Sequence, residues 1–130
     1  MQLNFLSSQV IQAAIHVHKE LGPGLLESVY QKCMLIEMKN MKMKVQTEVP
    51  LPIYYRGQCV QPEGFRLDLL VEDTVIVEIK SVEKDQDLHK KQLLTYLRLA
   101  NKPLGLLINF NTTLLKEGIN RIINTPDESS

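Results

Sequence analysis

The fold of this chain is decided by residues 65–80, which read FRLDLLVEDTVIVEIK. From Phe65 to Val71 apolar residues recur at every second position, the period that is typical of a strand. Residues 75–80 are almost wholly apolar, as in a strand that is buried on both faces of a sheet. A short polar segment separates the two runs, so the pattern predicts two neighbouring antiparallel strands at the centre of a sheet.

The flanking segments extend this pair into an α/β protein. We expect helices at residues 8–21, 23–40, 85–100 and 112–123, and further strands at 45–55, 58–60 and 104–110. Pro50 and Pro52 restrict the strand at 45–55 to a sheet edge or to an irregular course, and Arg56-Gly57 predicts a turn. The order ααβββαβα predicts an α/β sandwich around a mixed sheet.

The first two helices carry apolar stripes that predict the core. The first helix repeats apolar residues at Val10, Ala14, Val17 and Leu21. Gly22 ends this helix, and Pro23 suits the first position of the next one. The second helix is expected to bury Leu26, Val29, Cys33 and Ile36. We expect the methionines of this region to fill the core or its edge rather than to form a binding surface: Met34, Met38, Met41 and Met43.

The composition indicates one globular domain. A chain of 130 residues with 44% hydrophobic side chains fits a single domain, which we place at residues 1–124 with a polar tail at 125–130. No apolar run reaches the ~18 residues of a membrane span, and the N-terminal residues lack the basic region of a signal peptide. Cys33 and Cys59 are expected to be reduced, so we expect a cytoplasmic protein. The 15 basic and 15 acidic residues cancel, which argues against binding nucleic acid through bulk positive charge.

Two acids interrupt the apolar strands, Asp68 in the first and Glu78 in the second. A buried carboxylate without a partner is costly, although Glu78 and Lys80 also fit a simple ion pair at the rim of the sheet. With a three-residue turn, Val71 lies opposite Val75 and the two acids share one face; with a two-residue turn they lie on opposite faces. Side by side, each acid would raise the pKa of the other. A divalent cation with oxygen ligands, Mg²⁺ or Mn²⁺, would relieve this repulsion.

These residues resemble the signature of the PD-(D/E)XK nuclease superfamily. Its motifs are matched, in chain order, by GLLESVY at 24–30, by Asp68, by Glu78-Ile79-Lys80 and by Gln92 to Tyr96. The first of these resembles the GxxExxY motif of a small branch of the superfamily, and the last resembles the QxxxY motif of RecB-like members. The resemblance spans about residues 20–110 and implies a restriction-endonuclease-like αβββαβ core, with a mixed central sheet flanked by helices. Leu67 stands where the superfamily usually has proline.

The resemblance also implies a role for each matching residue. The metal would be bound by Asp68, by Glu78, by the carbonyl group of Ile79 and by Glu27 from the second helix. Lys80 would orient or help deprotonate the attacking water and offset negative charge in the transition state. The site would be braced, or the phosphate contacted, by Gln92 and Tyr96, which lie four apart on one helical face, with support from Tyr30.

Two of these assignments compete with simpler ones. Glu27 also suits the positive end of its helix, a placement worth about 0.3–1 kcal/mol without any metal. Lys84, Lys91 and Arg98 recur every seven residues and could contact a phosphate backbone. A solvated helix face explains these three cations equally well.

The resemblance therefore favours a Mg²⁺- or Mn²⁺-dependent nuclease that hydrolyses phosphodiester bonds in DNA, with RNA as the second choice. The alternative is a nuclease fold without activity that serves as a nucleic-acid-binding or protein-assembly module. The small size of the chain leaves little beyond the core to grip a substrate, so a second copy or a partner protein is expected to supply further contacts.

Overall fold

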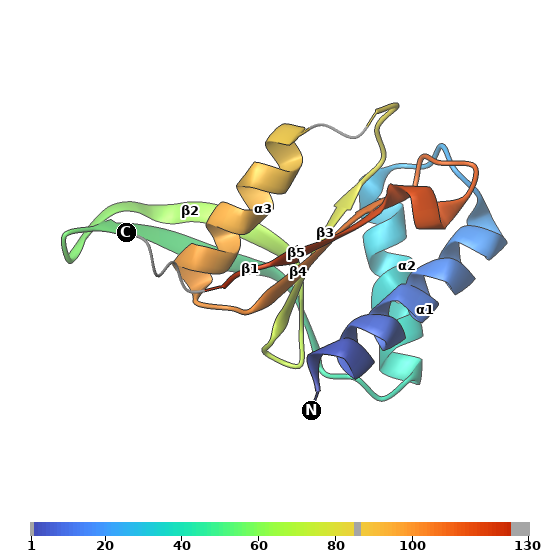
Figure 1. Ribbon diagram of the computed structural model, residues 1–130, viewed down its shortest axis with the longest axis horizontal. Helices are drawn as coiled ribbons and strands as arrows, with labels where there is room; N and C mark the ends of the chain where they lie inside the picture. The colour runs from blue at the N-terminus through green and yellow to red at the C-terminus, as the bar shows by residue number, and fades with distance from the viewer. Residues whose placement is uncertain (1, 85–86, 126–130) are drawn as a thin grey trace.

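A five-stranded mixed sheet forms the centre of the protein (Figure 1). The computed structural model describes residues 2–84 and 87–125. Within them the strands follow the order β1-β2-β3-β4-β5: β1 Val45–Tyr55, β2 Gln58–Val71, β3 Val75–Lys80, β4 Leu104–Asn109 and β5 Ile119–Ile123. Strands β3 and β4 are parallel, whereas the other neighbours are antiparallel. The expected mixed sheet with flanking helices is confirmed.

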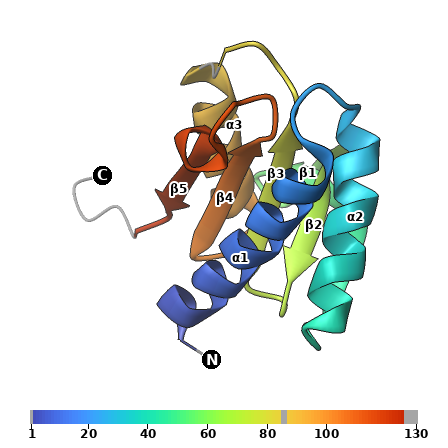
Figure 2. The ribbon, with the colours of Figure 1, turned by 90° about the vertical axis from the view of Figure 1, so that its right-hand side faces the viewer.

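Helices cover both faces of the sheet (Figure 2). One face carries α1 Leu3–Leu21 and α2 Glu27–Asn40, and the other carries α3 Asp87–Ala100. Each helical layer closes its own apolar cluster against the sheet. The central strands β3 and β4 are therefore buried on both faces, which explains why their sequences are almost wholly apolar.

The expected core of α2 was wrong except at Cys33, which is partly buried and packs against the apolar cluster. Leu26, Val29 and Ile36 are exposed, whereas Tyr30, Met34 and Met38 are fully buried. The helix begins at Glu27, after an irregular segment that contains Pro23. Two stripes at helical spacing compete on this sequence, and the sheet selects the one that carries the larger side chains.

The methionines do fill the core, as expected. Met34, Met38 and Met43 are buried in the same apolar cluster, and Met41 packs against it. Long unbranched side chains adapt to the irregular space between a helix and a twisted sheet. The stripe expected for α1 is confirmed at Val10, Ala14 and Val17, but not at Leu21, which is exposed at the end of the helix.

The last segment forms a strand, so the helix expected at residues 112–123 was wrong. A short 3₁₀-helix, η1 Leu115–Gly118, leads directly into β5, which pairs antiparallel with β4. Ile119 packs against one apolar cluster and Ile122 against the other, the alternation of a strand. Glycine is required at 118, because a Cβ there would collide with the carbonyl oxygen of Asn109.

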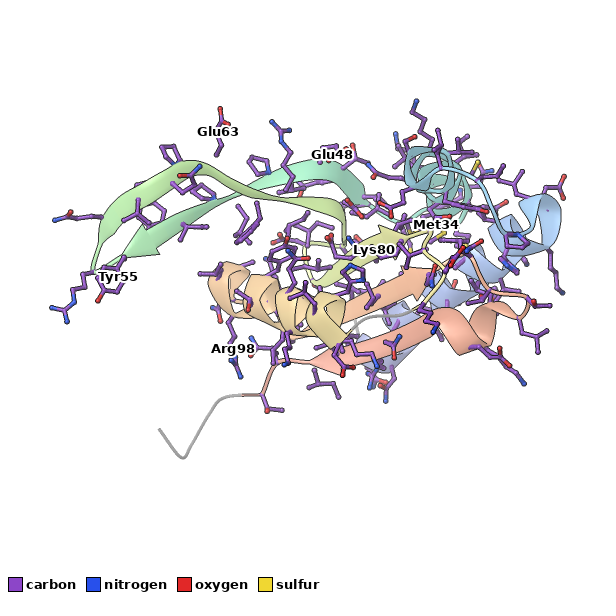
Figure 3. The ribbon with its side chains drawn as sticks, turned by 90° about the horizontal axis from the view of Figure 1, so that it is seen from above. Met34, Glu48, Tyr55, Glu63, Lys80 and Arg98 are labelled. Atoms are coloured by element: carbon purple, nitrogen blue, oxygen red, sulfur yellow. The ribbon has the colours of Figure 1, made fainter. Side chains whose placement is uncertain are left out.

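Strands β1 and β2 form a long hairpin that extends well beyond the rest of the sheet (Figures 1 and 3). Strand β2 pairs with β3 only at residues 69–71, whereas it pairs with β1 along most of its length. We call the projecting part, residues 49–67, the arm. Its turn at Arg56-Gly57 has φ of 50° and 79°, the left-handed pair that a two-residue hairpin requires. The expected turn and the edge position of β1 are confirmed.

None of the helices in the described ranges is long and apolar enough to cross a membrane. The predicted tail lies outside the described residues except for Thr125.

Candidate active site

The turn between β2 and β3 decides how the two acids lie. It has three residues, and Val71 pairs with Val75 and Leu69 with Val77. Thr74 donates its backbone N–H to the carbonyl oxygen of Val71 at 2.9 Å and its hydroxyl to the carbonyl oxygen of Glu72 at 2.7 Å. Of the two registers that the sequence permits, the structure has the one in which the acids share a face.

The carboxylates of Asp68 and Glu78 each accept a backbone hydrogen bond from the opposite strand, next to the pair Leu69 and Val77 where the regular pairing of β2 and β3 ends. The backbone N–H of Asp68 donates to Glu78 Oε2 at 2.9 Å. The backbone N–H of Ile79 donates to Asp68 Oδ2 at 2.8 Å. Each carboxylate thus occupies the place of a backbone carbonyl, and this reciprocal pair of bonds holds the acids side by side.

Burial makes this pair of acids hard to ionise. Glu78 is only 7% exposed, and its burial, followed by the charge of Asp68, raises its pKa to about 8. Burial also raises the pKa of Asp68, although the hydrogen bond from Ile79 and the charge of Lys80 act in the opposite direction. Near neutral pH the pair retains a proton unless a cation compensates its charge. Such a pair of oxygen donors suits a hard divalent cation.

Lys80 stands beside the two acids. It follows Glu78 by two positions on β3, so both side chains project from the same face of the sheet. Its charge lowers the pKa of Asp68 and of Glu78. The carbonyl oxygen of Lys80 accepts a bond from the N–H of Phe110 at 2.9 Å. The backbone that carries the lysine is therefore fixed to the segment after β4.

Glu27 approaches the site from α2 without completing a three-acid cluster. Its Oε2 accepts the backbone N–H of Ser81 at 3.2 Å, and Ser81 Oγ donates to the carbonyl oxygen of Leu25 at 2.7 Å. These bonds connect the start of α2 to the end of β3, and the charge of Glu27 raises the pKa of Asp68. Within residues 2–84 and 87–125, no three His, Cys, Asp or Glu side chains converge closely enough to hold a metal ion.

Tyr30 supports the site from a distance. Its ring is buried and stacks on Phe110, with centroids 4.4 Å apart. Its hydroxyl donates to the carbonyl oxygen of Gly22 at 2.5 Å and accepts the N–H of Leu25 at 3.1 Å. Tyr30 therefore closes the loop between α1 and α2 and fixes the start of the helix that carries Glu27.

Tyr96 lies close to the acids on the α3 side of the sheet. It is buried, and its ring contacts Phe65 of the arm, with centroids 4.7 Å apart. Burial, followed by the charges of Glu78 and Asp68, raises the pKa of its hydroxyl to about 12. Gln92 lies one helical turn earlier and is half-buried. The structure thus brings Tyr96 to the site and places Gln92 beside it on the helix.

The three candidate phosphate contacts do not form one helical line. Helix α3 begins at Asp87, so Lys84 precedes it. Lys91 and Arg98 are exposed, on the side of the helix that faces away from the buried Leu93 and Leu97. Helix geometry therefore turns these two cations away from the sheet that carries the acids.

Glu48, which the sequence pattern did not single out, is a fourth acid near the site. Its neighbours pair as Thr47 with Leu69 and Val49 with Leu67, which places Glu48 level with Asp68. Its φ is 50°, a left-handed conformation that is rare for a non-glycine residue. Its charge raises the pKa of both Asp68 and Glu78. Only the register of β1 on β2 reveals this proximity.

Asn109 was also missed, although it orders the segment that follows Lys80. It is 1% exposed and lies opposite Lys80 in the parallel pairing of β3 and β4. Its Oδ1 accepts the N–H groups of Val82 and Asn111, both at 3.1 Å, and its Nδ2 donates to the carbonyl oxygen of Val82 at 3.0 Å. A polar residue at the end of an apolar strand was the available signal.

Comparison with known families matches residues 4–122 to the model of the PD-(D/E)XK nuclease superfamily. Comparisons with curated proteins and with solved structures give no significant match. The matched range includes the paired acids, Lys80 and most of the sheet, and nucleases of this superfamily generally use divalent metal ions. Because the match covers most of the chain and the mixed sheet with its flanking helices agrees with it, the protein belongs to the PD-(D/E)XK nuclease superfamily.

Proposed function

We propose that the protein is a metal-dependent nuclease that hydrolyses phosphodiester bonds in DNA, with RNA as the second choice. The observation that carries the proposal is the juxtaposition of Asp68 and Glu78 through reciprocal backbone bonds, with Lys80 beside them. A domain that only binds other molecules gains nothing from two acids that are costly to bury together. A nuclease needs this arrangement, because the acids hold a cation against the phosphate.

Each residue of the site has a proposed part in hydrolysis. Asp68, Glu78 and the carbonyl group of Ile79 would hold Mg²⁺ or Mn²⁺, with Glu27 as a further acid at the edge of the site. The bound ion would supply Lewis acidity toward the phosphate and the attacking water. Lys80 orients that water and offsets negative charge as the new P–O bond forms and the old one breaks. Tyr96, with Gln92, braces the acids or contacts the phosphate.

The sequence motifs give this proposal a finer form. Gly24, Glu27 and Tyr30 have the spacing of the GxxExxY branch of the superfamily, and we propose membership of that branch. We also propose that residues 1–124 act as one domain, and that a second copy or a partner protein adds contacts to the nucleic acid.

A nuclease fold without activity, serving as a binding or assembly module, is the second candidate. The observation in its favour is that Glu27 is engaged by the Ser81 N–H and forms no close three-acid group with Asp68 and Glu78. Metal binding and turnover separate the two candidates.

Metal binding can be measured without activity. Mn²⁺ should raise the melting temperature of the wild-type protein and leave Asp68→Asn unchanged. Glu63→Gln is the matched control, because Glu63 is an exposed acid on the arm, and Figure 3 shows it well apart from Lys80. Equal responses of wild type and Asp68→Asn would exclude the metal site.

Turnover is measured with labelled single- and double-stranded DNA and Mg²⁺. The wild-type protein should cleave, whereas Lys80→Met should lose most of the activity while its Mn²⁺-dependent stabilisation remains. Metal binding without cleavage would favour the inactive module. Full activity in Lys80→Met would contradict the role given to the lysine.

A further inference from the structure

The arm presents a tyrosine and an arginine at its tip. Tyr55 is 64% exposed at the end of β1, and the guanidinium group of Arg56 lies over its ring, 5.6 Å from the centroid. Arg56 is the first residue of the turn between β1 and β2 and has a left-handed φ of 50°. The Tyr55 ring is therefore exposed to solvent and contacts a cation, so it does not contribute to the core. Such a ring is suited to stacking on another flat aromatic group.

One face of the arm leads from this tip to the acids. Val49 and Leu51 pack on the apolar cluster beneath α3, and strand alternation places Ile53 and Tyr55 on the same face. The register shifts of the hairpin insert residues into β2 and leave the alternation of β1 intact. We call this face, with Val49, Leu51, Ile53 and Tyr55, the inner face of the arm.

Aromatic side chains continue this face to the catalytic end. Phe65 of β2 lies opposite Leu51 and contacts the ring of Tyr96. Tyr96 in turn lies close enough to Glu78 and Asp68 that their charges, after burial, raise the pKa of its hydroxyl. Figure 3 shows the arm as a ribbon that spans from the region of Lys80 to Tyr55, beyond the end of α3 marked by Arg98.

We propose that Tyr55 stacks on an unpaired base of the nucleic-acid strand whose phosphate lies at Asp68 and Glu78. This inference rests on the proposed function and adds a substrate class, a strand with unpaired bases. Stacking suits an aromatic ring without sequence preference, and Arg56 adds positive charge for the backbone. Pairing of β1 with a second copy is disfavoured, because Pro50 and Pro52 remove backbone donors from this edge strand.

The length of the arm sets the size of the substrate. Gln58, the partner of Tyr55, precedes Asp68 by ten residues on β2, which corresponds to about 30 Å of strand. A stacked nucleic-acid strand covers this distance in about nine nucleotides, and an extended one in fewer. A strand of about three nucleotides at the acids cannot reach Tyr55.

The test is binding of fluorescein-labelled oligo(dT) to the full chain, followed by anisotropy with Ca²⁺ in place of Mg²⁺. For an oligonucleotide of about 15 residues, Tyr55→Ala should weaken binding between about fivefold and a hundredfold, whereas Tyr55→Phe should stay within twofold. For one of about three residues, Tyr55→Ala should have no effect. Tyr54→Ala is the matched control, because Tyr54 is the adjacent residue, is 61% exposed and lies on the opposite face.

Each outcome supports or overturns the inference. Equal losses in Tyr54→Ala and Tyr55→Ala, no loss in Tyr55→Ala, or no binding of the longer oligonucleotide by the wild type would overturn it. The same dependence on Tyr55 with a blunt duplex would overturn the requirement for unpaired bases. If the wild type cleaves DNA but Tyr55→Ala binds the oligonucleotide as tightly as the wild type, the stacking role is overturned and the nuclease proposal stands. Binding that depends on Tyr55, without any cleavage, would support the stacking role of Tyr55 and overturn the nuclease proposal.

Discussion

Replacement of Glu78 by glutamine should change how the stability of the protein depends on pH. Burial and Asp68 raise the pKa of Glu78 from 4.5 to about 8, so the folded protein holds this proton more tightly than the unfolded chain does. Between these two values the unfolded chain loses its proton first. The stability of the wild type should therefore fall as pH rises from about 4.5 to about 8 and change little above that range.

The size of this effect follows from the shift. A difference of between three and four pH units corresponds to at most about 5 kcal/mol, and relaxation of the pair with Asp68 makes the measured value smaller. Glu78→Gln retains an oxygen that can accept the N–H of Asp68 but carries no charge. The variant should thus match the wild type near pH 4.5 and exceed it in free energy of unfolding by several kcal/mol above pH 8.

Urea unfolding at a series of pH values, with EDTA present, measures this difference directly. Glu63→Gln, which removes an exposed acid from the arm, should run parallel to the wild type. With Mn²⁺ in place of EDTA, the fall in wild-type stability between pH 4.5 and about 8 should be smaller, because the ion compensates the same charge as the proton. Parallel curves for wild type and Glu78→Gln, or a wild type that gains stability with rising pH, would refute the account of a buried, repelling pair.

Four further substitutions test the packing that holds the site. Met34→Ala should cost about 2–5 kcal/mol of unfolding free energy and Ile36→Ala less than about 0.5 kcal/mol, as measured by urea unfolding; comparable losses would contradict the buried stripe of α2. Asn109→Ala leaves the backbone groups of Val82 without their side-chain partner and should cost about 1–3 kcal/mol, with faster hydrogen exchange at Val82; unchanged exchange would contradict the role given to the Asn109 side chain. Gly118→Ala should lower the melting temperature by several degrees because of the collision at Asn109, and an unchanged value would show that the turn yields.

The residues of the candidate site could be predicted where a charged side chain interrupts the apolar pattern of a strand. An acid inside an apolar strand is conspicuous at Asp68 and Glu78, and Lys80 follows by strand alternation. Glu48 gives no comparable signal, because it lies in a polar edge strand. Asn109 gives only a weaker one, because it is a polar residue at the end of an apolar strand and not inside it. Their importance arises from the strands next to them, which a single segment of sequence does not reveal.

Local patterns were ambiguous where two arrangements fit the same residues. Helix α2 offers two apolar stripes, and contact with Phe110 and the sheet selects the one that contains Tyr30. Residues 119–123 suit a helix as well as a strand, but the open edge of β4 supplies hydrogen-bond partners only to a strand. In both cases a neighbour distant in the chain made the choice.

Side-chain periodicity and the polar breaks between segments were enough to predict the α/β class and the central hairpin, and to single out Asp68 and Glu78 as acids in apolar strands. These features follow from local geometry and from the cost of burying charge, which depend on residues near one another in the chain. The alignment of Glu48 with Asp68, the direction of the arm and the partners of Glu27 depend instead on contacts between distant segments. Such contacts form only when the helices pack on the two faces of the sheet, because this packing decides which side chains of neighbouring elements meet.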